Sequence, residues 1–142
     1  MIKNYDPSRV SVSWGPINIT GFAEGTFVEA ERDEDGFTKY VGSQGEVCRT
    51  RNLNKSGKVT VTLMATSPIN DLIDLYASVD EDLGLGGVWP LRINDFNGYL
   101  RVSATEAWVM KKPKAERAKE AGTVVWVFDC AAIRIEPRGN IL

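Results

Sequence analysis

The stretch from Phe27 to Leu63, FVEAERDEDGFTKYVGSQGEVCRTRNLNKSGKVTVTL, carries a charged or amide side chain at almost every second position. Apolar residues recur between these positions with the same period, and such alternation is typical of strands with one buried and one solvated face. The alternation is cleanest at the end of the stretch, where Val59, Val61 and Leu63 are separated by threonines. The stretch therefore predicts an antiparallel sheet, and it raises the question of what the solvated face is for.

Turn residues divide the rest of the chain into further strands. Gly15-Pro16 is expected to close one hairpin, and Asn97-Gly98 is expected to close another. The pair at 35–36, Asp-Gly, can supply the positive φ of a tight turn, so it is expected to join two neighbouring strands directly. Strands are expected over residues 10–14, 17–20, 26–32, 37–41, 46–51, 58–66, 91–95, 99–110 and 123–135.

One helix is expected, and it begins after Ser67. Serine can cap the first turn and proline suits the first helical position, so the helix is predicted over Pro68–Tyr76, ending before the segment DEDLGLGG at 80–87. An apolar stripe with i, i+3, i+4 and i+7 spacing is expected to pack on the sheet. This stripe consists of Ile69, Leu72, Ile73 and Tyr76. The predicted fold is mainly β, an antiparallel β-sandwich or barrel with one flanking α-helix, formed by residues 1–142 as one domain.

Residues that could carry chemistry are few. The chain of 142 residues has no histidine, which removes the commonest general base and the commonest metal ligand. Cys48 and Cys130 lie far apart without metal-binding spacing, and both are expected to be free thiols, buried or half-buried. The glycines at 84–87 lack the spacing of a nucleotide-binding loop, and the acidic runs at 33–35 and 80–82 lack that of a calcium loop. We therefore expect no catalytic residue, no cofactor and no metal.

The composition indicates a soluble globular protein, with 43% hydrophobic and 25% charged residues. A net charge of −2 gives no basic footprint for tight binding to nucleic acid. No apolar run is long enough for a signal peptide or a membrane span, so the chain is expected to remain in the cytoplasm where it is made. The tryptophans are expected to pack within the sheet, because three of the four lie beside valines in strand patterns.

Several segments, in this order, resemble the tail tube proteins of contractile-tailed bacteriophages: GEVCRTRNLNKSGKVTVTL, TSPINDLI, INDFNGYL and EAWV. The resemblance extends from about Val10 to Ile135 and rests on order and spacing, since none of these segments is a catalytic motif. It implies a sandwich or barrel with a flanking helix, of which six copies form a ring. The sheets of a ring would join into one inner barrel. Rings would stack into a tube within a contractile sheath, as in R-type bacteriocins and type VI secretion systems.

The resemblance also implies partners and a location. A tail tube is a structural component of the virion, and it is assembled in the host cytoplasm. It would contact the sheath, baseplate and tail terminator proteins. Its lumen would pass the tape-measure protein and the genomic DNA without binding them specifically, and no membrane would be involved.

On this interpretation, the polar side of the sheet is the wall of a water-filled channel. A neutral to acidic wall would keep DNA from adhering, because lysine and arginine contacts to phosphate drive nonspecific binding. The candidate lumen residues are Glu29, Glu31, Lys39, Thr60 and Thr62. The candidate contacts between subunits or rings are Asp33, Glu34, Asp35, Arg49, Arg51, Asn52, Asn54 and Lys55.

The sequence leaves alternatives open for these residues. Arg49 and Arg51 either pair with Glu29 and Glu31 across strands or face the next subunit. The polar side chains can also belong to an ordinary solvated surface. The chain can then be a monomeric β-barrel module that binds a small ligand or a carbohydrate, and its oligomeric state would separate that module from a tube.

Overall fold

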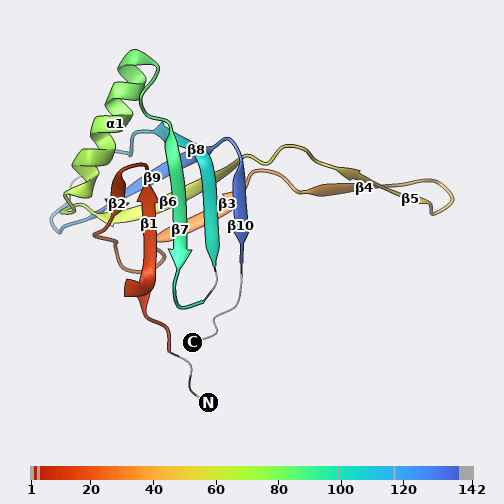
Figure 1. The fold of residues 1–142 in the computed structure, drawn as a ribbon, viewed down its shortest axis with the longest axis horizontal. Coiled ribbons are helices and arrows are strands. Elements are labelled where there is room, and N and C mark those ends of the chain that lie inside the picture. The colour runs from red at the N-terminus through yellow and green to blue at the C-terminus, as the bar shows by residue number, and fades with distance from the viewer. Residues whose placement is uncertain (1, 3, 99, 117, 138–142) are drawn as a thin grey trace.

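The computed structural model describes residues 2, 4–98, 100–116 and 118–137. Figure 1 shows strands in two layers, a helix across one end of them, and a two-stranded arm that extends away from the rest. The elements are the 3₁₀ turn η1 (Pro7–Arg9), the strands β1 (Val10–Trp14), β2 (Ile17–Ile19), β3 (Val28–Arg32), β4 (Phe37–Val41), β5 (Val47–Arg51), β6 (Gly57–Met64), β7 (Trp89–Asp95), β8 (Arg101–Lys111), β9 (Thr123–Cys130) and β10 (Ile133–Glu136), and the helix α1 (Ile69–Leu83). The predicted fold class, mainly antiparallel β with a flanking helix, is confirmed.

The main sheet runs in the order β2-β1-β7-β8-β9-β6-β3, with β10 also paired to β8. The long strand β8 connects the two layers, since its first half pairs with β7 and β10 and its second half pairs with β9. In Figure 1, β3, β6 and β9 run behind β1, β7 and β10. Each layer therefore has an inner face toward the core and an outer face toward solvent.

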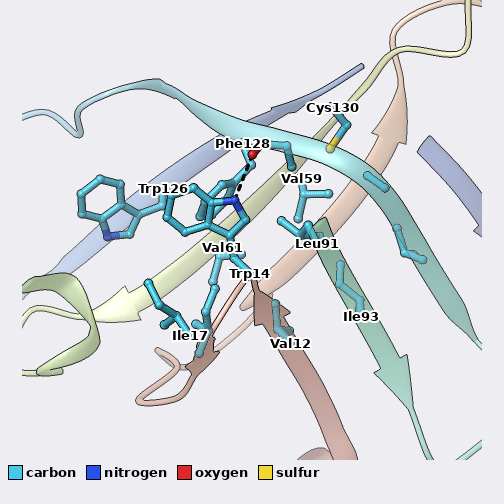
Figure 2. Packing of buried hydrophobic residues seen from close by; sticks show 14 of the residues in the cluster. Val12, Trp14, Ile17, Val59, Val61, Leu91, Ile93, Trp126, Phe128 and Cys130 are labelled. Atoms are coloured by element: carbon cyan, nitrogen blue, oxygen red, sulfur yellow. Dashed lines mark hydrogen bonds between the residues drawn. The ribbon is translucent and has the colours of Figure 1, made fainter. Parts of the chain in front are cut away.

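The core between the layers is centred on Trp14, whose side chain is fully buried. Its indole N–H donates a hydrogen bond to the carbonyl of Ala107 at 3.0 Å, and its ring lies 5.0 Å from that of Phe128 (Figure 2). Val59 and Val61 of β6 enter the same core from the other layer, as the alternation predicted. The layers are thus held together by apolar packing around one satisfied aromatic side chain.

One predicted turn is confirmed and another is wrong. Gly15, at φ +56°, joins β1 to β2 as expected. The pair at 35–36 closes no hairpin, because β3 pairs with β6, from Val28 opposite Val61 to Arg32 opposite Gly57. The residues 33–36 instead lead the chain out of the main sheet into the arm. The turn of the arm lies at 42–45, where the last glycine has a φ of +85°.

The predicted strand over 123–135 is divided into β9 and β10. Between them, the amide of Ala131 donates to the carbonyl of Glu106, and the amide of Ile133 donates to that of Lys55. The chain therefore leaves the β6 ladder and continues along β8 at this point.

Helix α1 is longer than the predicted 68–76 and ends at Gly84, which adopts the left-handed conformation with a φ of +71°. The acidic residues 80–82 continue the helix, and a glycine stops it because only glycine adopts this conformation without strain. Ser67 contributes a long hydrogen bond to the first turn, from the amide of Ile69 at 3.4 Å, and donates to the carbonyl of Thr20. Within the described residues, no helix combines the length and hydropathy that crossing a bilayer requires.

The predicted apolar stripe of α1 is wrong at one position. Ile73 is fully buried, and Ile69 and Tyr76 are partly buried against the core. Leu72, however, is 44% exposed, and Ala77 takes the buried place instead. The i, i+3, i+4 pattern sets the width of an apolar face, but the centre of that face depends on what the helix packs against. Leu72 belongs to a second, solvated face of the helix.

Substituting Ile73→Ala is expected to lower the free energy of unfolding by about 2–5 kcal/mol, because it leaves a cavity in a closed core. Leu72→Ala is the matched control on the same helix, and it is expected to change that free energy by about 0.5 kcal/mol or less. Urea denaturation followed by circular dichroism measures both. Equal losses in the two variants would show that the buried side of α1 has been misplaced.

Candidate assembly surfaces

The arm, defined as the β4–β5 hairpin with its turn (residues 37–51), has no second layer of structure against it (Figure 1). All ten of its strand residues are exposed. Lys39 lies directly opposite Arg49, and Phe37 lies opposite Arg51, so one face of the arm carries three cations. The Arg49 guanidinium lies 4.1 Å from the centre of the Phe37 ring, a cation–π contact. Like charges directly opposite one another destabilise a strand pair, so this face is suited to an acidic partner.

The arm ends in a polar turn at 42–46 that includes the exposed Glu46, and apolar side chains are exposed directly behind this turn. Tyr40 and Val47 are 73% and 67% exposed, and Val41 beside them is also largely exposed. A two-stranded hairpin is marginally stable by itself, and these side chains gain nothing from burial in the isolated subunit. The arm therefore has the composition of a surface that becomes covered.

The two cysteines lie in opposite environments, and one prediction about them is wrong. Cys48 lies opposite Tyr40 on the arm and is exposed, although it was expected to be at least half-buried. Cys130 is buried, and burial raises the pKa of its thiol to about 11. Both are free thiols, as expected. Thiol reagents react with the thiolate, so only Cys48 is set up to react near neutral pH.

The neck, defined as residues 33–36 and 52–56, joins the arm to the main sheet. The side-chain amide of Asn52 donates to a carboxylate oxygen of Glu34 at 2.8 Å and to the carbonyl of Asp35 at 3.1 Å. The hydroxyl of Ser56 donates to a carboxylate oxygen of Asp33 at 2.9 Å. These bonds connect the strands where they leave the sheet and fix the direction of the arm.

The remaining neck residues support the same geometry. Hydrogen bonds from the side chains of Asn52 and Asn54 lower the pKa of Glu34, so this exposed carboxylate stays charged under mildly acidic conditions. The carbonyl of Lys55 accepts the amide of Ile133. The structure thus brings together the predicted contact residues of the neck, and their role between subunits stays a prediction.

Four of the five candidate lumen residues share one surface. This acidic face is the outer face of the β3–β6–β9 layer and consists of Glu29, Glu31, Lys58, Thr60, Thr62, Val125, Val127 and Asp129. Lys58 lies between Glu31 and Asp129 in the register, so three carboxylates and one ammonium group give the face a net charge of −2. Lys39 is the exception, because it lies on the arm and not on this layer.

Of the two alternatives for Arg49 and Arg51, cross-strand pairing with Glu29 and Glu31 within the subunit is wrong. In the described part of the chain, β5 pairs only with β4, and β3 pairs only with β6. The two arginines are therefore left to face solvent or another copy.

The other layer carries a basic outer face, which the sequence analysis missed. This basic face consists of Arg92, Asn94, Arg101, Ser103, Arg134 and Glu136 on β7, β8 and β10. Arg134 forms an ion pair with Glu136 at 2.9 Å, and the three guanidinium groups leave a net charge of +2. The sequence contained a signal for this face, because polar residues recur two positions apart in each of these three strands.

The main sheet has open strand edges at β2, β3 and β10. Each of these strands has a single pairing partner among the described residues. Open edges present unpaired backbone groups that another chain can pair with. No group of three or more potential ligand residues that could hold a metal ion occurs in the described ranges.

Comparisons with known proteins agree with this geometry. A structural protein of Pseudomonas phage KPP10, named ORF10, is 30% identical over 145 residues, which cover 97% of this chain and 84% of that protein. The fold is similar to a chain in the cryo-EM structure of the anti-feeding prophage cap, with a TM-score of 0.65 and 10% identity over 96% of this chain and 93% of that one. It is also similar to a chain in the sheath–tube complex of the extracellular contractile injection system PVC, with a TM-score of 0.62 and 13% identity over 94% and 91%.

The family match decides the class of protein. Residues 11–136 match the family described as bacteriophage PhiTE tail tube protein, and this range contains the whole sheet apart from the first residue of β1. The family is one of tail tube proteins and the phage KPP10 relative is named a structural protein, so neither is an enzyme. The chain therefore belongs to the bacteriophage PhiTE tail tube protein family and is a structural component of the phage tail.

Proposed function

We propose that six copies of this chain form a ring, and that rings stack into the inner tube of a contractile tail through which DNA is ejected. The whole chain, residues 1–142, acts as one tail-tube domain. The observation that carries this proposal is the arm, which exposes the apolar side chains behind its turn and three cations without any cover in the isolated subunit. Such an arm gains stability only when it is docked on another chain.

The open edges of the sheet support ring formation. If an edge strand of one copy pairs with the sheet of the next, the β3–β6–β9 layers continue from copy to copy around a ring. Each ring then has one closed wall, and its edges are no longer exposed. Both cysteines are free, which fits assembly in the reducing cytoplasm of the host.

The charges of the two outer faces support an orientation. Arginines on a channel wall would bind phosphate and hold DNA, so we assign the acidic face to the lumen and the basic face to the outside. The tape-measure protein and the DNA would then pass the acidic face without specific binding. The basic face would meet the sheath, and the ends of the tube would meet baseplate and terminator proteins. A sheath and a tube occur together in the complex to which this fold is similar.

Arm variants test the proposal. Arg49→Glu with Arg51→Glu is expected to abolish tube formation, because it reverses the charge of the docking face without disturbing a buried contact. Lys114→Glu with Lys119→Glu is the control, since it makes the same change of charge on exposed residues outside the arm. Electron microscopy and light scattering measure assembly, and circular dichroism verifies the fold.

Two outcomes would contradict the proposal. A wild-type chain that remains monomeric at high concentration, without rings or tubes, would favour the ligand-binding module. Normal tubes from the arginine variant would show that the arm is not an assembly surface.

A further inference from the structure

A groove of about 560 Å³ lies at the opposite end of β3 from the arm. Its apolar walls come from segments far apart in the sequence, namely Val10, Ala23, Phe27, Val28 and Ile93. We call it the basal groove. Ile93 and Ala23 are buried, while Phe27 is packed on Phe22 with their ring centres 4.8 Å apart, so the walls are fixed by the core. A firm apolar hollow of this size binds either a small molecule or a protruding side-chain cluster.

The rim of the basal groove is acidic, since Glu24 and Asp95 belong to its lining. The arm has the matching properties in the matching order. Exposed apolar side chains lie behind its polar turn, and the cations Lys39 and Arg49 follow them. If these apolar side chains lie in the groove, the cations come near its acidic rim, and opposite charges around an apolar centre are typical of specific protein interfaces.

The two surfaces also have suitable positions. The groove lies where β3 begins at Val28, and the arm leaves where β3 ends at Arg32. Figure 1 shows the arm extending away from the main sheet. Because the arm and the groove lie at different ends of one subunit, the arm does not fill the groove of its own subunit. A contact between the arm of one copy and the groove of the next is head-to-tail, and such contacts repeat from copy to copy and close into a ring or continue along a stack.

We propose that the basal groove receives the apolar side chains behind the turn of the arm, Tyr40, Val41 and Val47, of a neighbouring copy. This inference rests on the proposed self-assembly and adds its acceptor site. It assigns the groove to a second copy of this chain, not to a small ligand.

Native Cys48 allows a direct test. Thr26 is exposed and lines the groove, so Thr26→Cys places a thiol beside the expected position of Cys48 from the neighbouring copy. Treatment of the assembled protein with a mild oxidant or a short bismaleimide is expected to link copies into a ladder on a denaturing gel. Cys130 does not interfere, because it is buried and its pKa is raised to about 11.

Two controls define the specificity of the cross-link. Thr26→Cys with Cys48→Ser should give no ladder, which excludes links between two groove thiols. Glu81→Cys, on the exposed surface of α1, should give none with Cys48. Adding Val41→Asp to the Thr26→Cys chain is expected to reduce the cross-linked fraction about tenfold or more, because it replaces a buried apolar contact by a charge.

Each outcome decides between the proposals. Tubes with the ladder support both the tube and the groove, and tubes without it overturn the groove alone. Linked copies without tubes would support the groove as the acceptor of the arm and would contradict the proposed tube. Monomers without links overturn both. An apolar small molecule retained in the groove of unassembled protein, seen as added mass in native mass spectrometry, would also overturn the groove as an acceptor of the arm.

Discussion

Tubes assembled from a Glu29→Lys and Glu31→Lys variant are expected to bind duplex DNA that wild-type tubes leave free. The two substitutions change the net charge of the acidic face from −2 to +2 in every copy, and a ring of copies multiplies the change. Each lysine that neutralises a phosphate releases a counterion. The logarithm of the binding constant therefore falls with the logarithm of the salt concentration, with a slope of about −0.9 for each phosphate contacted. Six to ten such contacts correspond to an affinity loss of about 10³–10⁵ between 50 and 200 mM salt.

The subunit itself should tolerate the change. Both glutamates are exposed, and the main cost is a like-charge pair between position 31 and Lys58, about 0.2–1 kcal/mol. Co-sedimentation of short duplex DNA with tubes at low and moderate salt measures the binding, and the DNA release rate of particles measures the consequence for ejection.

Glu81→Lys with Asp82→Lys is the matched control, because it makes the same charge change on the exposed surface of α1. This control should not slow DNA release, since a charge outside the channel does not meet DNA in transit. A lumen variant that assembles and releases DNA at the wild-type rate would show that Glu29 and Glu31 face elsewhere.

The largest loss of stability is expected for Trp14→Ala. The side chain is fully buried, contacts Phe128 and Tyr76 and donates to the carbonyl of Ala107 across the core. Truncation of a buried tryptophan costs about 3–5 kcal/mol, and the unpaired carbonyl adds to it. Domains have about 5–15 kcal/mol in total, so the variant would lose about a fifth of its stability or more.

Trp14→Phe separates the two contributions. It keeps an aromatic ring in the core and loses the donor to Ala107, so it is expected to cost about 1–3 kcal/mol. Denaturation in urea followed by circular dichroism measures both variants. If Trp14→Ala unfolds at the wild-type midpoint, the core is not organised around this residue.

The buried half of the fold was predictable because alternation reports burial directly. Val59, Val61 and Leu63 follow it without exception, and the tight turn at Gly15 fixes the first hairpin locally. Alternation also placed Glu29 and Thr60 on solvated faces of their strands, and the register shows that they are neighbours.

What failed was the choice of partner strand. A turn dipeptide at 35–36 favours a local hairpin, but β3 gains more by pairing with β6 in the main sheet. For the same reason, alternation placed Lys39 on one face of its strand but did not show that this strand lies outside the main sheet. The basic face was only partly within reach of the sequence, because Arg92 and Arg101 meet in the expected hairpin at 97–98 whereas Arg134 joins them through the long-range pairing of β10 with β8.

Because the chain is synthesised from its N-terminus, the arm is made before the basal groove can form. The arm is complete once residue 51 has been made, whereas the groove needs Ile93 beside Val10 and Phe27. The 42 residues from 51 to 93 take roughly 2–8 s to add at 5–20 residues per second. During that interval a nascent chain can offer its arm to finished copies but has no site that accepts one. Incomplete chains therefore cannot polymerise with one another on neighbouring ribosomes. Growth of the tube begins only from subunits in which the main sheet has formed completely.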